Sequence, residues 1–271
     1  VLNRGDASPK YFSFDKSNFL GISHGTIVGG IIAAKGNNKE GISGICWNCK
    51  IMPLKVLDTQ GEGTAGSIVK AIDYAIANKA DIINLSFFGQ GRSRLIEEAV
   101  QKAHNAGIVV VAAAGSETLK NQVVFGIDLN KNPGSPVCAD NAGTDKNVIL
   151  GVAATDPLDQ KSLFSNYGSN CIDISAPGYG FYSTIIRDPL IESKDYYGGL
   201  YSGTSLSAPI VSGAAALLKS LIPNLTNKEI VQILLESAEP LTLLNNDGQE
   251  NMGTGRLNIR KALELALKKY A

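Results

Sequence analysis

The chain has 271 residues, of which 44% are hydrophobic, and its 25 Lys and Arg residues balance 25 Asp and Glu residues. That length suits one α/β domain with a single large core, so we expect one domain over residues 1–271. The charge balance argues against bulk attraction to nucleic acid or to an anionic membrane. No stretch approaches the roughly 18 consecutive apolar residues of a transmembrane helix. Val1 reads as the inside of a strand, so we expect that an N-terminal portion is missing.

Strand and helix patterns alternate along the chain. Buried parallel strands are predicted at residues 51–57, 81–86, 108–113 and 148–153. Helices are predicted at residues 24–35, 65–79, 93–105 and 226–237, with a last amphipathic helix that ends near residue 270. Thr226 and Glu229 form the pattern of a capping box. This alternation predicts an α/β fold, doubly wound, with a mostly parallel sheet and helices on both faces.

The four cysteines are too few for a scaffold built on disulfides. Cys46 and Cys49 have the C-x-x-C spacing of zinc and redox sites. Neither a second C-x-x-C pair nor an H-x₃-H pair follows, because the other two cysteines, Cys138 and Cys171, lie far apart. The residues therefore disfavour a zinc site and leave structural disulfides and reduced thiols open. His104, near the end of a predicted helix, is expected to lie at the surface.

One stretch predicts an exposed nucleophile. Residues 203–209 read Gly-Thr-Ser-Leu-Ser-Ala-Pro, and the apolar run 210–218 follows. The glycine permits a tight backbone path, and the helix N-terminus supplies free N–H groups and positive potential around Ser205. An isolated Gly-Thr-Ser would more simply be a serine N-cap on a core helix.

A second motif lies upstream, where residues 23–30 read Ser-His-Gly-Thr-Ile-Val-Gly-Gly and place His24 at the head of a small-residue helix. Taken together, the two motifs resemble those of the subtilisin-like serine proteases, and the resemblance runs from about residue 1 to the C-terminus. It implies that Ser205 is the nucleophile and His24 the catalytic histidine. It also implies a subtilisin-like fold, a secreted protein, a polypeptide substrate or bound peptide segment, a propeptide as a partner, and a structural calcium as the candidate cofactor. It favours disulfides over reduced thiols.

The family's acid position is altered. The family has a pattern like Val-Leu-Asp-Thr-Gly, and residues 1–5 here read Val-Leu-Asn-Arg-Gly, so Asn3 takes the place of the aspartate. The separation from Asn3 to His24, 24 − 3 = 21 residues, is shorter than the family's usual spacing. Asp6 and Asp15 are therefore rivals for the acid, and a chance match at the terminus is the simpler alternative.

The family's substrate-binding segments also map onto this chain. Gly61 and Gly63 match the edge segment on which an extended substrate adds a strand, although an ordinary glycine-rich loop explains them equally well. Ser86 matches the start of a second substrate strand, which the family continues as Leu-Gly-Gly. Here Phe87 and Phe88 follow, so a large ring occupies a position where glycine lets substrate approach.

The oxyanion position is altered as well. Ala113 and Gly115 match a further substrate-binding segment, after which the family has an asparagine whose amide binds the oxyanion. This chain has Ser116 there, with a shorter side chain that can still donate a hydroxyl hydrogen bond.

These departures leave three hypotheses. The chain is a subtilisin-like endopeptidase of normal or much reduced activity, a pseudoprotease kept as a binding or regulatory module, or a protease that was inactivated by design. Asparagine brings no charge to the histidine and favours the wrong imidazole tautomer. Loss of the acid costs about 10⁴-fold in serine proteases, subtilisin among them.

Overall fold

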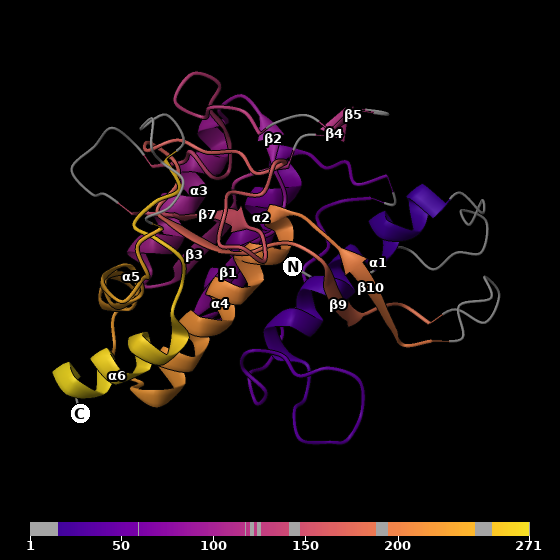
Figure 1. Cartoon of the computed structure of the whole chain (residues 1–271). Helices are drawn as coiled ribbons and strands as arrows, with labels where there is room; N and C mark the ends of the chain where they lie inside the picture. The colour runs from indigo at the N-terminus through magenta and orange to yellow at the C-terminus, as the bar shows by residue number, and fades with distance from the viewer. Residues whose placement is uncertain are drawn as a thin grey trace.

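The computed structural model describes residues 16–58, 60–116, 118–119, 122–123, 126–140, 147–187, 195–241 and 251–270 (Figure 1). A four-stranded parallel sheet has the order β1-β3-β7-β8. Its strands are β1 (Ile82–Leu85), β3 (Val109–Ala113), β7 (Leu150–Thr155) and β8 (Ile174–Pro177). Three antiparallel pairs accompany it: β2 (Gly89–Gln90) with β6 (Gly134–Ser135), β4 (Thr118–Leu119) with β5 (Gln122–Val123), and β9 (Phe181–Thr184) with β10 (Tyr197–Tyr201).

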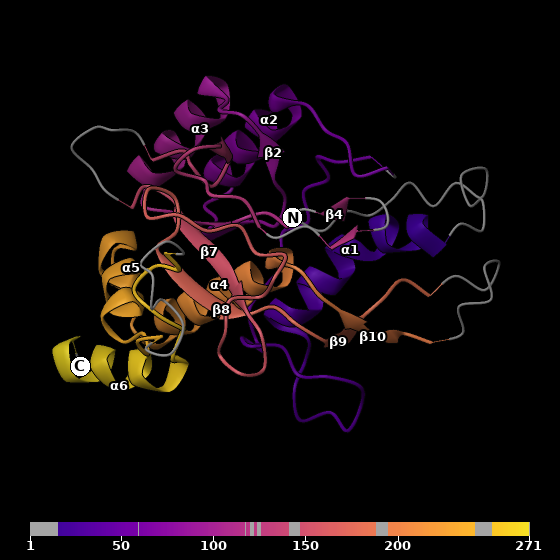
Figure 2. The same cartoon turned by 45° about the horizontal axis from the view of Figure 1, so that its top comes forward.

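Helices cover both faces of the parallel sheet, as Figure 2 shows. One face packs against α1 (Lys16–Ala33), α4 (Thr204–Leu221), α5 (Asn227–Glu236) and α6 (Ile259–Tyr270). The other packs against α2 (Ala65–Ala77) and α3 (Arg94–Asn105). Successive side chains of a strand point to opposite faces, so Val109 and Val111 join the first core while Val110 and Ala112 join the second. The predicted doubly wound α/β fold is confirmed.

Helix starts follow the local sequence. At α5 the Thr226 hydroxyl accepts a hydrogen bond from the Glu229 N–H at 3.2 Å, and the Glu229 carboxylate accepts one from the Thr226 N–H at 2.8 Å. These two bonds confirm the predicted capping box. Thr64 and Ser67 form a second capping box at the start of α2.

The predicted strand over residues 51–57 is wrong, since none of the described strands pairs with this segment and it has no strand geometry. A parallel strand needs a neighbour for its backbone groups. The side chain of Val56 packs in one core cluster with Ile83 and Leu85 of β1, and a cavity of about 1140 Å³ is lined by Lys50 and Ile51 on one side and by Ile82 and Asn84 on another.

Two histidine predictions need correction. Helix α1 begins at Lys16, so His24 lies in its middle and not at its head; the sequence between them contains no proline that would stop the helix. His104 is buried and not at the surface, because Asn227 of α5 covers it and donates a hydrogen bond to the His104 carbonyl at 2.9 Å.

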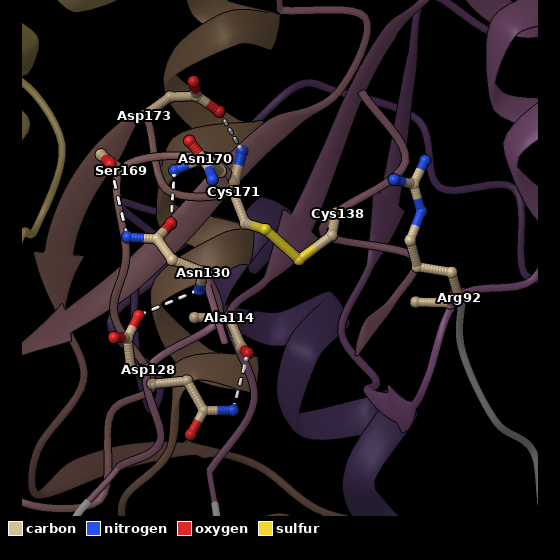
Figure 3. Close-up of a disulfide and its surroundings, with 12 residues drawn as sticks. Arg92, Ala114, Asp128, Asn130, Cys138, Ser169, Asn170, Cys171 and Asp173 are labelled. Carbon is tan, nitrogen blue, oxygen red and sulfur yellow. Dashed lines mark hydrogen bonds between the residues drawn. A yellow bond between two sulfur atoms is a disulfide. The ribbon is translucent and has the colours of Figure 1, made fainter. Parts of the chain in front are cut away.

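The structure resolves the cysteines as two disulfides, Cys46–Cys49 and Cys138–Cys171. The second ties the segment after β6 to the turn before β8 (Figure 3). In the described part of the chain no group of His, Cys, Asp and Glu side chains could hold a metal ion. Calcium also binds backbone carbonyl and amide oxygens, so the expected structural calcium stays a prediction. None of the described helices is long and apolar enough to cross a bilayer.

Asp173, shown in Figure 3 before β8, links stability to pH. Burial raises the pKa of its carboxyl from 3.8 to about 7, although the Gly151 N–H donates to it at 2.7 Å. The unfolded chain therefore releases this proton at lower pH than the folded chain. As pH rises from 3.8 to about 7, Asp173 lowers the free energy of unfolding.

We therefore expect Asp173→Asn to raise the melting temperature by several degrees at about pH 8 and to change it little at about pH 4. The asparagine oxygen can still accept from the Gly151 N–H. Thermal unfolding followed by circular dichroism measures both values, with the exposed Asp81→Asn as the matched control. An equal shift at the two pH values would show that burial of the charge is not the cause.

Candidate active site

A cleft of about 540 Å³ lies at the carboxyl ends of β1 and β3 and at the N-terminus of α4. Ligands of open α/β sheets bind at this edge. The residues that line the cleft come from four segments of the chain: His24, Ser86, Phe87, Phe88, Gln90, Ala113, Gly115, Ser116, Thr204 and Ser205. The structure thus brings the nucleophile and histidine candidates to one cleft, together with most of the proposed substrate-binding residues.

Ser205 lies in the first turn of α4, two residues after a glycine that the backbone requires. Gly203 has φ 155°, and a side chain there would approach the Ser205 hydroxyl. The Gly203 N–H donates to the Gly178 carbonyl at 2.8 Å, which fixes the turn. Ser205 therefore lines the cleft and lies in a rigid turn at the N-terminal, positive end of α4.

The first backbone N–H groups of α4 differ in whether they have a hydrogen-bond acceptor. The Thr204 N–H donates to the Ser116 hydroxyl at 3.0 Å, and the Leu206 N–H to the Gly203 carbonyl at 3.0 Å. Within the described ranges nothing accepts from the Ser205 N–H. It remains a donor for an anionic ligand in the cleft.

His24 is half-buried, and burial lowers the pKa of its imidazole from 6.5 to about 4. The ring is therefore neutral at pH 7. No side chain that the structure describes hydrogen-bonds to this imidazole or forms an ion pair with it. A neutral imidazole can accept a proton, but a pKa this low makes it a weak base.

Ser116 reaches the cleft from the end of β3 and is tied to the start of α4. Thr204 is 1% exposed, and its hydroxyl accepts from the Gly115 N–H at 3.0 Å. Ser116 Oγ is the neighbour to which this buried hydroxyl can donate, at 3.2 Å. With this assignment Ser116 Oγ accepts from both the Thr204 hydroxyl and the Thr204 N–H, and the Ser116 hydrogen is left available to an acceptor in the cleft.

The Phe88 ring packs against two glycines, in space that a side chain at either position would otherwise fill. A Cβ on Gly115 or on Gly134 would collide with the Phe88 ring. The ring packs on the core beneath the cleft and also lines the cleft itself. The ring therefore occupies space beside Gly115 at the floor of the cleft.

We expect Phe88→Gly to deepen the cleft beside Gly115 and to shift preference toward peptides with large side chains before the scissile bond. The shift should reach about tenfold, because one extra buried side-chain segment in an apolar pocket changes selectivity by 10–200-fold. Profiling of a peptide library against wild type and Phe88→Gly measures it, with Phe181→Ala on the β9–β10 hairpin as control. The same preference in all three proteins would show that Phe88 does not set selectivity.

Other predicted site residues fall elsewhere. Gly61 and Gly63 do not line the cleft; they lie in a turn before α2, where Asp58 accepts from the Gln60 N–H at 2.8 Å. Their role in substrate binding stays a prediction. Asn3, like its rivals Asp6 and Asp15, lies outside the described residues.

Sequence reasoning missed two residues of the cleft, Gln90 and Thr204. Thr204 stands inside the motif that identified Ser205, so its polar side chain beside the nucleophile was a usable signal. Gln90 lies in β2 and belongs to no motif. Only the pairing of β2 with β6 places it at the cleft.

Comparisons with known proteins agree with this geometry. A profile described as the Subtilase family matches residues 15–256. The thermostable alkaline protease of Halalkalibacterium halodurans is 37% identical over 218 residues, which cover 79% of this chain and 52% of that protein. Subtilisin amylosacchariticus of Bacillus subtilis subsp. amylosacchariticus is 35% identical over 246 residues, covering 90% of this chain and 56% of that one.

A relative that matches this chain over more residues, and a solved structure, are also similar to it. Subtilisin DY of Bacillus licheniformis is 32% identical over 255 residues, covering 94% of this chain and 82% of the relative. A solved structure described as a protease from Pseudoalteromonas arctica superposes with a TM-score of 0.73 at 31% identity, covering 90% of this chain and 70% of the other. The chain spans a little over half of the first two relatives, at 52% and 56% of their lengths.

Proposed function

The chain belongs to the Subtilase family, and from that premise we propose that it is a single subtilisin-like domain that hydrolyses peptide bonds slowly through Ser205 and His24. The observation that carries the proposal is the shared cleft at the N-terminus of α4, which His24 and Ser205 both line. The substrate is an extended polypeptide. The two disulfides support export to an oxidising compartment.

The reaction follows from the groups at the cleft. Ser205 Oγ attacks the carbonyl carbon of the peptide bond while His24 accepts the hydroxyl proton. The carbonyl oxygen becomes an oxyanion, which the Ser205 N–H and the Ser116 hydroxyl can stabilise. The His24 imidazolium then donates its proton to the leaving amine, and water releases the acyl group in a second round of the same steps.

Two features of this site make the reaction slow. Asn3 at the family's acid position provides no negative charge for the imidazolium, and burial has already lowered the His24 pKa to about 4. Ser116 at the oxyanion position is shorter than asparagine, and its oxygen is held against Thr204. The imidazolium and the oxyanion therefore both form with less stabilisation than the family's aspartate and asparagine would provide.

A binding module is the second candidate, because Phe88 and the low His24 pKa weaken catalysis while the cleft remains open. As a pseudoprotease, the chain would hold a peptide segment or a propeptide in the same cleft without cleaving it. A protease would cleave the bound peptide, whereas a binding module would leave it intact.

Turnover of a fluorescently labelled unfolded protein separates the two candidates. We expect slow cleavage by wild type and none by Ser205→Ala, while both proteins bind the same peptide with equal affinity. Binding without any cleavage by wild type would favour the binding module. Equal cleavage by Ser205→Ala would overturn the proposed nucleophile.

A further inference from the structure

A proline interrupts the helix that carries the proposed nucleophile. Pro209 lies inside α4, four residues after Ser205. In a regular helix the Ser205 carbonyl would accept a hydrogen bond from the N–H of residue 209. Proline has no N–H, so the Ser205 carbonyl loses its helical donor. A backbone carbonyl in a buried turn needs a replacement.

The replacement comes from β1. The Ser86 hydroxyl, 8% exposed, donates to the Ser205 carbonyl at 2.8 Å. It fills the place of the missing helical bond and ties the nucleophile's own peptide unit to the end of the sheet. Ser205 is thus held by two elements that lie 119 residues apart in the chain.

Two further side chains fix the direction of this bond. The Asn84 amide donates to Ser86 Oγ at 2.8 Å, and the Asn84 oxygen accepts from the Ser212 hydroxyl at 2.9 Å. A carbonyl can only accept, so the Ser86 hydrogen must point to Ser205, and its lone pair must receive the Asn84 amide. In the chain of hydrogen bonds Ser212–Asn84–Ser86–Ser205, each residue therefore donates to the next. The side chains of Ser212, Asn84 and Ser86 are buried.

We propose that Ser86 and Asn84 are positioning residues that replace the helical hydrogen bond removed by Pro209 and thereby aim the Ser205 hydroxyl at the substrate. Ser212, two turns along α4, anchors the Asn84 amide. The proposal rests on the proposed function, because it assigns these residues a task in nucleophilic attack. Its structural half, that Ser86 stands in for a helical donor, is independent of activity.

The proposal makes Ser86 dispensable once residue 209 has an N–H. Pro209→Ala restores the donor four residues after Ser205, so the double variant Ser86→Ala/Pro209→Ala should recover what Ser86→Ala loses. A role for Ser86 in substrate contact or in general packing would not be rescued by this change. Wild type, Ser86→Ala, Pro209→Ala and the double variant form a double-mutant cycle. This cycle therefore distinguishes a positioning role of Ser86 from a role in substrate contact or in packing.

The test measures labelling of Ser205 by a small fluorophosphonate, resolved into the limiting rate and the half-saturating concentration. We expect Ser86→Ala to lower the limiting rate about tenfold with an unchanged half-saturating concentration, and Asn84→Ala to do the same. In the Pro209→Ala background Ser86→Ala should change the limiting rate by less than about twofold. Ser207→Ala removes a hydroxyl of the same helix that bonds to the Pro177 carbonyl at 3.0 Å, and it should leave the rate unchanged.

An equal loss from Ser86→Ala with and without Pro209 overturns the proposal, as does no loss in either background. Urea unfolding of the same four proteins gives a second measure, because the effects of the two substitutions on stability should also couple. If neither wild type nor Asn3→Asp/Ser116→Asn is labelled, the proposed function fails and positioning fails with it. The coupling in stability then still shows whether Ser86 replaces the helical bond.

Discussion

Asn3→Asp combined with Ser116→Asn is expected to raise peptide hydrolysis by at least about 10³-fold over wild type. The aspartate would stabilise the imidazolium that forms when His24 accepts the Ser205 proton, and the asparagine amide would reach the oxyanion. In subtilisin and related enzymes, restoring the acid alone corresponds to a gain in rate of about 10⁴-fold. Restoring the oxyanion amide corresponds to a gain in rate of about 10²–10³-fold. We expect less than the product, because groups that act as a unit are not additive.

Turnover of an unstructured protein by wild type, both single variants and the double variant measures this gain, with Ser205→Ala as background. The gain should depend on pH, because a neighbouring carboxylate raises the His24 pKa and a protonated His24 cannot act as base. The double variant should therefore lose activity at a higher pH than wild type. If Asn3→Asp gains nothing while Asp6→Ala or Asp15→Ala abolishes a real wild-type activity, the acid has been placed wrongly.

The second large effect is expected from Ser116→Ala, which should lower the residual rate about 10²-fold, in line with removal of one oxyanion donor. The change removes the hydrogen that Ser116 directs into the cleft and leaves the buried Thr204 hydroxyl without its acceptor. The limiting rate should fall while substrate binding changes little, since the oxyanion exists only in the transition state.

Steady-state kinetics of Ser116→Ala measures this effect. Ser202→Ala is the control, since its hydroxyl accepts from the Gly180 N–H at 3.0 Å just before the nucleophile turn and lies outside the cleft lining. A change in substrate binding alone would assign Ser116 to ground-state contacts and not to the oxyanion.

The parallel sheet and its helices were predictable because their patterns are local. The uninterrupted apolar run at β3 and the helical period at α2 each reflect burial of one element against its neighbours. The capping box at Thr226 is equally local. The predicted strand over residues 51–57 failed because a strand also requires a partner beside it: none of the described strands pairs with this segment, and an apolar pattern does not report on pairing.

The two proposed catalytic residues were predictable from motifs, but their surroundings were not. The sequence shows Ser116 in place of asparagine, whereas only the structure shows that Thr204 occupies both lone pairs of its oxygen. The same holds for Ser86, whose bond to Ser205 spans two distant segments. The His24 pKa is lowered mainly by burial, which depends on the folded structure and which no local pattern encodes.

In the proposed mechanism His24 and Ser205 act as one unit. Labelling of Ser205 by a fluorophosphonate, measured against pH in wild type and in His24→Ala, tests this cooperation. We expect a wild-type rate that is flat near neutral pH and falls as His24 is protonated around its pKa of about 4, and a His24→Ala rate that is far slower and lacks this transition. Equal rates and identical pH profiles in the two proteins would contradict it.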